Sequence, residues 1–109
     1  RTLRQELRLL LKEERQRQAK AVAEVIKNSQ VVCSTLTGVQ TRDLRNERFD
    51  LAVIDEAAQA LEVATWAAIL KAKRAVLAGD HLQLPPTIIS KKAESQGLGR
   101  TLFQRLQEM

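Results

Sequence analysis

The sequence predicts an α/β fold: a parallel sheet with flanking helices, preceded by one long, stalk-like helix. Residues 2–28 contain neither glycine nor proline and consist largely of strong helix formers. Two short, mostly apolar runs, 49–55 and 74–79, each end abruptly in acidic or polar residues, as buried parallel strands do at the carboxyl edge of a sheet. An alanine-rich segment with helical spacing, 59–71, separates these runs, which is the order of a parallel crossover.

The first helix carries its apolar residues near its two ends. The stretch from Lys12 to Gln18 contains none, so we expect the helix to pack at its ends and to stand in water in between. At 1.5 Å per residue it would be roughly 40 Å long. We therefore divide the chain into a basic stalk-like helix, 1–29, and a partial α/β domain, 30–109.

The other elements follow in the order that their apolar runs and turn residues indicate. We expect a buried strand at 30–35 that contains Cys33, a turn at Thr37-Gly38, a polar connection at 41–48, a strand at 49–55, a helix at 59–71, a strand at 74–79, a break at Pro85-Pro86, a short helix or loop at 90–96, and the start of a helix at 101–109. Three strands are too few for a complete doubly wound nucleotide-binding domain, so we expect further strands outside these residues.

Composition limits the class of protein. Of the net charge of +5, the first 29 residues contribute +4, from eight Lys/Arg and four Asp/Glu. A basic helix of this kind is either an ordinary solvated face or a nucleic-acid contact. The single cysteine excludes an internal disulfide and fits a reducing compartment. No run has transmembrane length and no signal peptide opens the chain, so we expect an intracellular protein, cytoplasmic and/or nuclear, without a membrane partner.

The candidate site lies at the ends of the two central strands. Two adjacent carboxylates at a sheet edge suit a magnesium nucleotide: Asp55 would hold the metal through water, and Glu56 would orient the attacking water. Gln83, after the next strand, would be a neutral sensor of the terminal phosphate. The alternative for the acidic pair is that it caps the following helix, where carboxylates are favourable.

The phosphate-binding half of such a site is missing. A phosphate loop needs glycines at fixed spacing followed by a lysine. The four glycines are at 38, 79, 97 and 99, and the only close pair, Gly97 and Gly99, has neither the spacing nor the lysine. We therefore expect these residues to be part of a larger enzyme and to be inactive alone.

Two motifs and a tail carry a resemblance to a known family. Residues 55–62 (DEAAQALE) and 79–86 (GDHLQLPP) resemble motifs II and III of superfamily-one helicases, and 97–106 resembles a tail of the branch that contains the nonsense-mediated-decay helicase and the immunoglobulin mu-binding helicase. Residues 59–62, Trp66 and the double proline favour the immunoglobulin mu-binding type. The tail has Thr101 where a serine is common. The resemblance covers roughly residues 30–109.

This resemblance implies a RecA-like fold of the P-loop NTPase class, use of ATP and Mg²⁺, and 5′-to-3′ unwinding of DNA or RNA. Asp55 matches the metal-binding carboxylate and Glu56 the water-activating one. Gln83 matches the residue that links the γ-phosphate to the grip on nucleic acid, and Gly79 and Asp80 match the strand-to-loop turn that presents it.

The resemblance also implies partners. Residues 32–38 resemble motif Ic, which places Thr35, Thr37 and Gly38 near a nucleic-acid strand, although these are equally ordinary turn residues. The first helix looks like a stalk that carries an inserted accessory domain. The expected partners are single-stranded or partly duplex DNA or RNA and the rest of a helicase chain: the phosphate loop, the second RecA-like domain and the accessory domain.

Two other functions stay open at this point. A non-catalytic nucleic-acid-binding module would use the basic helix, but its acidic pair would repel a phosphate backbone unless a cation lay between. Another P-loop phosphohydrolase would explain Asp55 and Glu56 but not the motif at 79–86.

Overall fold

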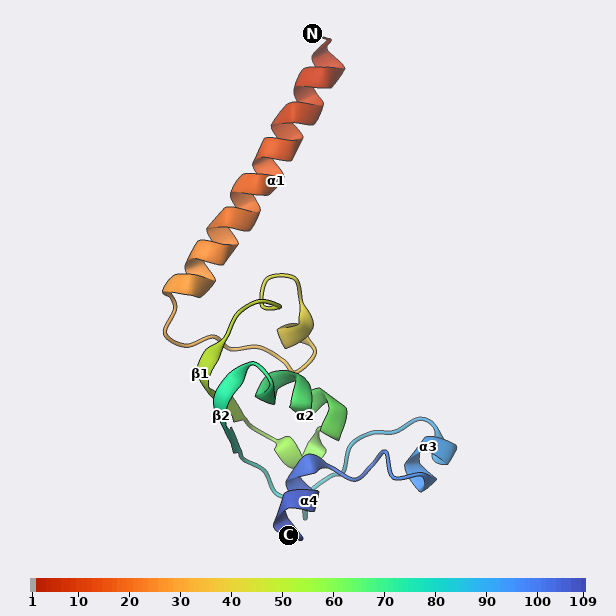
Figure 1. The fold of residues 1–109 in the computed structure, drawn as a ribbon. Coiled ribbons are helices and arrows are strands. Elements are labelled where there is room, and N and C mark those ends of the chain that lie inside the picture. Colours follow the sequence, from red (N-terminus) through yellow and green to blue (C-terminus); the bar gives the residue numbers. More distant parts are fainter. Residues whose placement is uncertain (1) are drawn as a thin grey trace. The chain divides into compact units, whose positions relative to one another are not determined.

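A computed structural model describes residues 2–109 and divides the chain into two compact units, Arg1–Cys33 and Ser34–Met109. The first unit is the predicted long helix, α1 (Leu3–Asn28), which is confirmed as one uninterrupted element (Figure 1). At its start the backbone N–H of Thr2 donates to the side-chain oxygen of Gln5 at 3.1 Å. At its end the hydroxyl of Ser29 donates to the carbonyl of Val25 at 2.7 Å. No residue of α1 is buried.

The strand predicted at 30–35 is not formed, and that prediction is wrong. The segment is irregular, Val31 is 79% exposed and Cys33 is exposed rather than buried. β-Branched residues favour an extended, half-buried surface, but a strand also needs a neighbour to accept and donate its ladder hydrogen bonds. Within residues 2–109 the sheet contains two strands, and neither pairs with this segment.

The second unit is built around a two-stranded parallel sheet, which confirms the predicted α/β class. Strands β1 (Phe49–Ile54) and β2 (Ala72–Leu77) run parallel, in a register that pairs Phe49 with Ala72 and Ile54 with Leu77. The crossover contains the 3₁₀ turn η2 (Ala57–Gln59) and helix α2 (Glu62–Ile69). Helix α2 is shorter than predicted because Gln59 belongs to η2, residues 60 and 61 are not helical, and residues 70 and 71 form a turn before β2.

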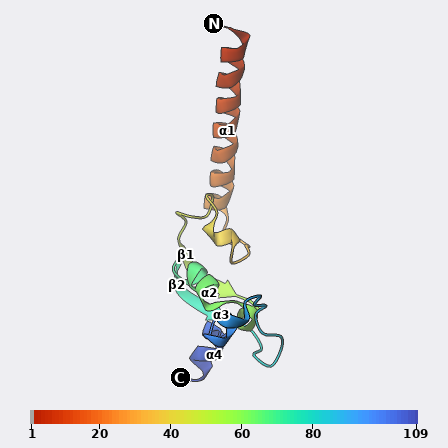
Figure 2. The ribbon, with the colours of Figure 1, turned by 90° about the vertical axis from the view of Figure 1, so that its right-hand side faces the viewer.

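Small residues allow α2 to lie close to one face of the sheet (Figures 1 and 2). The core consists of Ile54, Ala57 and Ala68, and partly buried apolar side chains pack against it: Leu36, Val39, Ile69, Leu77 and Phe103. The opposite face of the sheet is exposed, with Leu51 at 46% and Val53 at 66%. The sheet is therefore covered on one side by the residues that the structure describes.

A buried lysine ties the polar connection before β1 to the start of β2. Lys71 is 8% exposed, and its ammonium donates to the carbonyls of Leu44 and Arg45, each at 2.8 Å. These two backbone acceptors satisfy a charge that would otherwise be costly to bury.

Three short helical elements complete the unit: η1 (Gly38–Gln40), α3 (Lys91–Ser95) and α4 (Leu102–Gln107). The hydroxyls of Ser90 and Thr101 accept hydrogen bonds from the first turns of α3 and α4, so both helices begin at a capping residue. Helix α4 packs on η2 beyond the carboxyl ends of the strands, whereas α3 lies on a long loop away from the sheet (Figure 1). Among the helices of residues 2–109, none is both long enough and apolar enough to cross a membrane.

Candidate functional site

The carboxyl edge of the sheet brings the two predicted motifs together. The N–H of Ala78, just after β2, donates to the carbonyl of Ile54 at 2.8 Å, and the N–H of Ala57 donates back to the carbonyl of Ala78 at 2.8 Å. These two hydrogen bonds enclose Asp55 and Glu56, and they extend the parallel ladder beyond the last paired residues. The acidic pair and the turn that follows β2 therefore share one rigid backbone frame.

Gly79 is required at this position for steric reasons. A Cβ atom built on Gly79 would lie 2.9 Å from the backbone nitrogen of Ala58 and 3.1 Å from that of Ala57. These neighbours are backbone atoms, which cannot rotate aside as the end of a side chain can. The glycine thus lets the turn after β2 approach the segment that follows the acidic pair.

Glu56 adopts an unusual backbone conformation. Its φ of 53° and ψ of 35° lie in the left-handed region, and it is the one non-glycine residue of the described chain with a positive φ. Such a conformation costs of order 1–3 kcal/mol and persists when the surroundings enforce it. The backbone N–H of Glu56 donates to Asp55 Oδ1 at 2.9 Å, and the Gln59 amide donates to Glu56 Oε2 at 3.1 Å.

Gln59 has a part in the site that the sequence reasoning did not assign. Its backbone N–H donates to the carbonyl of Glu56 at 2.9 Å, in addition to the side-chain contact. The spacing of three residues between Glu56 and Gln59 is the available signal, because residues that far apart face each other across one helical turn. Gln59 therefore fixes the direction of the Glu56 carboxylate.

Asp80 and Gln83 form a small hydrogen-bonded turn. Asp80 Oδ1 accepts from the N–H of Leu82 at 2.9 Å, and Oδ2 accepts from the side-chain amide of Gln83 at 3.4 Å. The N–H of Gln83 also donates to the carbonyl of Asp80 at 3.2 Å. Asp80 thus shapes the loop, and Gln83 is exposed with its amide carbonyl available to another donor.

The residues predicted near nucleic acid form a separate turn. The N–H of Gly38 donates to Thr35 Oγ1 at 3.0 Å, and the side chains of Leu36 and Val39 pack against the core. Thr37 is exposed. Within the described residues no hydrogen bond joins this turn to the acidic pair or to Gln83. Contact of Thr35, Thr37 and Gly38 with nucleic acid stays a prediction.

An ion pair between two residues that are far apart in the sequence joins α4 to α2. Arg105 in α4 donates to both carboxylate oxygens of Glu62, from Nε at 3.1 Å and from Nη2 at 2.6 Å, and the indole N–H of Trp66 donates to the same carboxylate at 3.0 Å. The Arg105 hydrogen bond, followed by that of Trp66, holds the pKa of Glu62 below its usual value, and Glu62 in turn raises the pKa of Arg105. This network fastens α4 to the first turn of α2, beside η2.

The Asp55 carboxylate is a suitable ligand for a hard cation that is held through water. One of its oxygens accepts the Glu56 N–H, whereas the other accepts no hydrogen bond from residues 2–109, and the side chain is exposed. Mg²⁺ characteristically binds one or two carboxylates and keeps several waters or phosphate oxygens. Asp55 is therefore suited to supply a protein ligand beside a metal–phosphate group.

Comparisons with known proteins agree on one family. A family model described as "AAA domain" matches residues 1–91. The rat (Rattus norvegicus) protein "DNA-binding protein SMUBP-2" is 45% identical over 109 residues, which cover 96% of this chain and 11% of the rat protein. The fission yeast (Schizosaccharomyces pombe) "DNA polymerase alpha-associated DNA helicase A" is 45% identical over 86 residues, 79% of this chain and 13% of that protein.

The motifs also resemble those of the nonsense-mediated-decay helicase, and a third relative is named as a regulator of nonsense transcripts. The Neurospora crassa "Regulator of nonsense transcripts 1 homolog" is 40% identical over 87 residues, 79% of this chain and 8% of that protein. The chain thus spans about a tenth of the length of these curated relatives. The chain belongs to the AAA-domain family that matches its residues 1–91 and, within it, to the branch of superfamily-one helicases that contains the nonsense-mediated-decay and immunoglobulin mu-binding helicases.

Proposed function

We propose that this chain supplies part of the ATP-hydrolysis site of a helicase that moves 5′ to 3′ on DNA or RNA. The observation that supports this most is the frame at the carboxyl ends of β1 and β2. There the acidic pair Asp55-Glu56 is tied by backbone hydrogen bonds to the Ala78-Gly79 turn that leads to Gln83. Ligands of open α/β sheets characteristically bind at this edge.

Asp55 would hold Mg²⁺ through water in this scheme. The metal, when bound, neutralises charge on the β- and γ-phosphates of ATP. The hydrogen bond from the Glu56 N–H fixes one carboxylate oxygen of Asp55, so the other is directed by the backbone rather than free to rotate. The role of Asp55 is therefore to bind and to orient.

Glu56 would accept the proton of the attacking water. The left-handed backbone at Glu56 and the hydrogen bond from Gln59 together hold its carboxylate in one direction without a basic partner among the described residues. A carboxylate free of a salt bridge can orient a water molecule and take its proton as the water adds to the γ-phosphorus. Departure of ADP completes the transfer.

Gln83 would connect the phosphate site to the grip on nucleic acid. A neutral amide can donate to a γ-phosphate oxygen and accept from a neighbouring group at the same time. Its hydrogen bond to Asp80 is long, at 3.4 Å, so it can be exchanged for a phosphate oxygen at small cost. Loss of the γ-phosphate would then change the contacts of the loop that carries Gln83.

The remaining parts of the enzyme would come from the rest of the protein. The phosphate loop, the second RecA-like domain and the accessory domain are not among these 109 residues, so we propose that the isolated chain does not hydrolyse ATP. Single-stranded or partly duplex DNA or RNA would be the substrate, and Thr35, Thr37 and Gly38 would lie near the strand. We place the enzyme in the cytoplasm and/or the nucleus.

Strand displacement by the full-length protein tests this function. Duplexes with a single-stranded tail at either the 5′ or the 3′ end are mixed with protein, ATP and Mg²⁺, and release of the labelled strand is followed. We expect ATP-dependent release from the duplex with a 5′ tail. Equal release without ATP, or release only from the 3′-tailed duplex, would contradict the proposal.

A further inference from the structure

Positive charge on α1 is gathered on one face of the helix. Arg4, Arg8, Lys12 and Arg15 recur every three or four residues, so at 3.6 residues per turn they fall within an arc of roughly 80°. We call these four residues the basic ridge. At 1.5 Å per residue their attachment points span about 16 Å along the helix.

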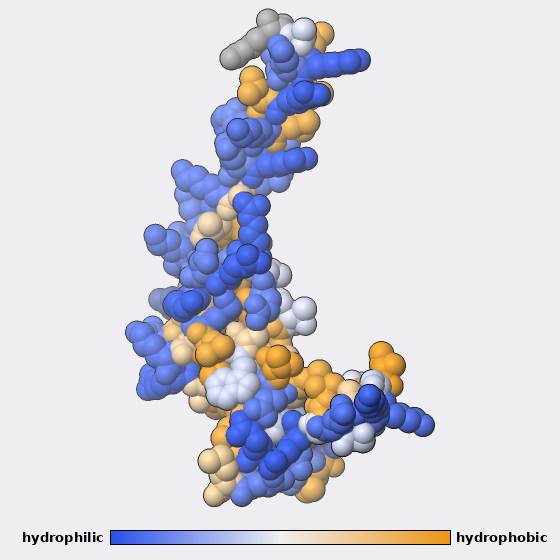
Figure 3. All heavy atoms as spheres, turned by 45° about the vertical axis from the view of Figure 1, so that its right-hand side comes forward, coloured by the Kyte–Doolittle hydropathy of each residue, from blue (hydrophilic) through white to orange (hydrophobic). Residues whose placement is uncertain are grey.

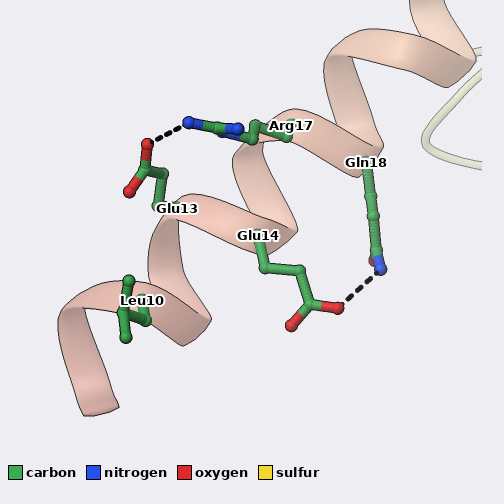
Figure 4. Close-up of a pocket in the computed structure, with 5 residues that line it drawn as sticks. All are labelled: Leu10, Glu13, Glu14, Arg17 and Gln18. Atoms are coloured by element: carbon green, nitrogen blue, oxygen red, sulfur yellow. Dashed lines mark hydrogen bonds and ion pairs between the residues drawn. The ribbon is translucent and has the colours of Figure 1, made fainter. Parts of the chain in front are cut away.

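The acidic residues of α1 lie on the other side. By the same geometry Glu6, Glu13, Glu14 and Glu24 fall within an arc of roughly 100° that is centred opposite the basic ridge. Figure 4 shows part of this acidic side, where Arg17 donates to Glu13 at 2.7 Å and Gln18 donates to Glu14 at 3.2 Å over the hollow beside Leu10. Two of the four carboxylates on this side have a cationic partner within the helix, because Glu13 pairs with Arg17 and Glu24 with Lys20.

The cations of the basic ridge have no such partners. All four of its side chains are exposed, and none forms an ion pair or a side-chain hydrogen bond within residues 2–109. A helix that is charged only for solubility characteristically alternates signs along each face. Like charges four residues apart, as in Arg4–Arg8–Lys12, instead destabilise an isolated helix. An anion that lies along the ridge would offset this repulsion.

The apolar residues of the helix leave the ridge accessible. Leu3, Leu7 and Leu10 are 85%, 57% and 62% exposed, and by helical geometry they lie roughly 100° or more from the centre of the ridge, on or next to the acidic side. Figure 3 shows hydrophilic residues over most of the visible surface of α1, with apolar ones toward its N-terminal end. A segment that covered these leucines would therefore leave the four cations open to a ligand.

We propose that the basic ridge binds the sugar–phosphate backbone of a nucleic-acid strand. The inference rests on the proposed function, since it names a surface that holds the substrate of the helicase. A phosphodiester chain fits because it is a linear anion, and because regularly spaced Lys and Arg side chains bind phosphates without reading sequence. A compact anion could meet only one or two of the four charges.

The test uses two variants of the full-length protein that lose the same charge. The ridge variant is Arg8→Gln/Lys12→Gln/Arg15→Gln. The matched control is Arg17→Gln/Lys20→Gln/Lys27→Gln, which removes three charges from the opposite side of the same helix. Glutamine forms helix about as well as lysine and arginine, so circular dichroism should show unchanged helicity in both.

Binding of a fluorescent single-stranded oligonucleotide is measured by anisotropy at several salt concentrations. The ridge variant should bind about tenfold or more weakly at 0.15 M salt, and its slope of log affinity against log salt should fall by about 2, at about 0.7 per lost phosphate contact. The control should keep the wild-type affinity and slope.

Each other outcome has a defined meaning. Equal losses in the two variants, or a ridge variant with the wild-type salt slope, would overturn the proposal. So would a ridge variant that loses binding to polyglutamate while it keeps its affinity for the oligonucleotide, because the surface would then recognise an acidic protein.

ATP hydrolysis and oligonucleotide binding by the wild type are measured in parallel. If the wild type neither hydrolyses ATP nor binds the oligonucleotide, the proposed function fails. If the wild type does both and the ridge variant binds the oligonucleotide as well as the wild type, only the proposal for the ridge is refuted.

Discussion

Gly79 lies against the backbone of Ala58, so close that a Cβ atom at position 79 would stand 2.9 Å from the Ala58 nitrogen. This contact, with the hydrogen bond from Ala57 to Ala78, joins the acidic pair to the loop of Gln83. The geometry of the candidate site therefore depends on the absence of one methyl group.

Gly79→Ala should destabilise the protein by about 1–3 kcal/mol, the usual cost of an extra methyl group in a packed site. Equilibrium urea unfolding of the wild type and the variant measures the change. Gly99→Ala is the control, because its Cβ would meet only the end of the Ile88 side chain, at 3.2 Å, and that side chain can move. Equal destabilisation by the two substitutions would show that the close approach at Gly79 has no special cost.

Arg105→Gln should lower stability at neutral pH and have a smaller effect in acid. The pKa of Glu62 is lowered in the folded protein, chiefly by the Arg105 hydrogen bond. The contribution of the pair is therefore fully present above the usual glutamate pKa of 4.5 and is lost as the pH falls through the lowered folded value. Urea midpoints of the wild type and the variant should differ at pH 7 and converge once the pH falls below the lowered pKa of Glu62.

The control for this pH dependence is Arg17→Gln, which breaks the exposed ion pair with Glu13 on α1. We expect it to change stability little at either pH, since exposed pairs of this kind contribute little. A difference between Arg105→Gln and the wild type that stayed constant from pH 7 down through the titration of Glu62 would mean that Arg105 acts through packing and not through the Glu62 carboxylate.

Gln83→Ala should separate ATP hydrolysis from unwinding. Nucleic-acid-stimulated hydrolysis and strand separation should both fall, with unwinding falling further, because the amide would no longer report the γ-phosphate to the strand-binding loops. Parallel ATPase and strand-displacement assays measure this. If nucleotide affinity were instead lost equally with and without nucleic acid, Gln83 would be a binding contact only.

Local patterns in the sequence were sufficient to predict α1, β1, the position of the acidic pair and the presence of β2, whose predicted bounds of 74–79 lie two residues later than the observed Ala72–Leu77. In α1 a long run of helix formers without glycine or proline decides the outcome. At Asp55 and Glu56 the end of an apolar run marks the sheet edge, and the resemblance to helicase motifs implies a role for the pair. Both signals are local in the sequence and need no distant partner.

The features that the sequence reasoning missed depend on distant partners. Residues 30–35 have the composition of a strand, but composition does not indicate whether a neighbouring strand is present to pair with it. Arg105 and Glu62 are 43 residues apart, and Lys71 lies 27 residues from Leu44, so no local spacing points to either contact. The left-handed backbone of Glu56 likewise results from the surrounding hydrogen bonds and not from its residue type.

The rate of ATP turnover by full-length Glu56→Gln, with saturating nucleic acid and Mg²⁺, is the most direct test of the proposed hydrolysis site. Nucleotide affinity is measured beside it, with Asp55→Asn as the contrasting variant that should weaken binding of the magnesium nucleotide itself. We expect Glu56→Gln to bind nucleotide nearly as well as the wild type and to turn over about a hundredfold or more slowly, the scale expected for loss of a positioned base. Near-normal turnover by Glu56→Gln would contradict the proposed role of Glu56 as the base.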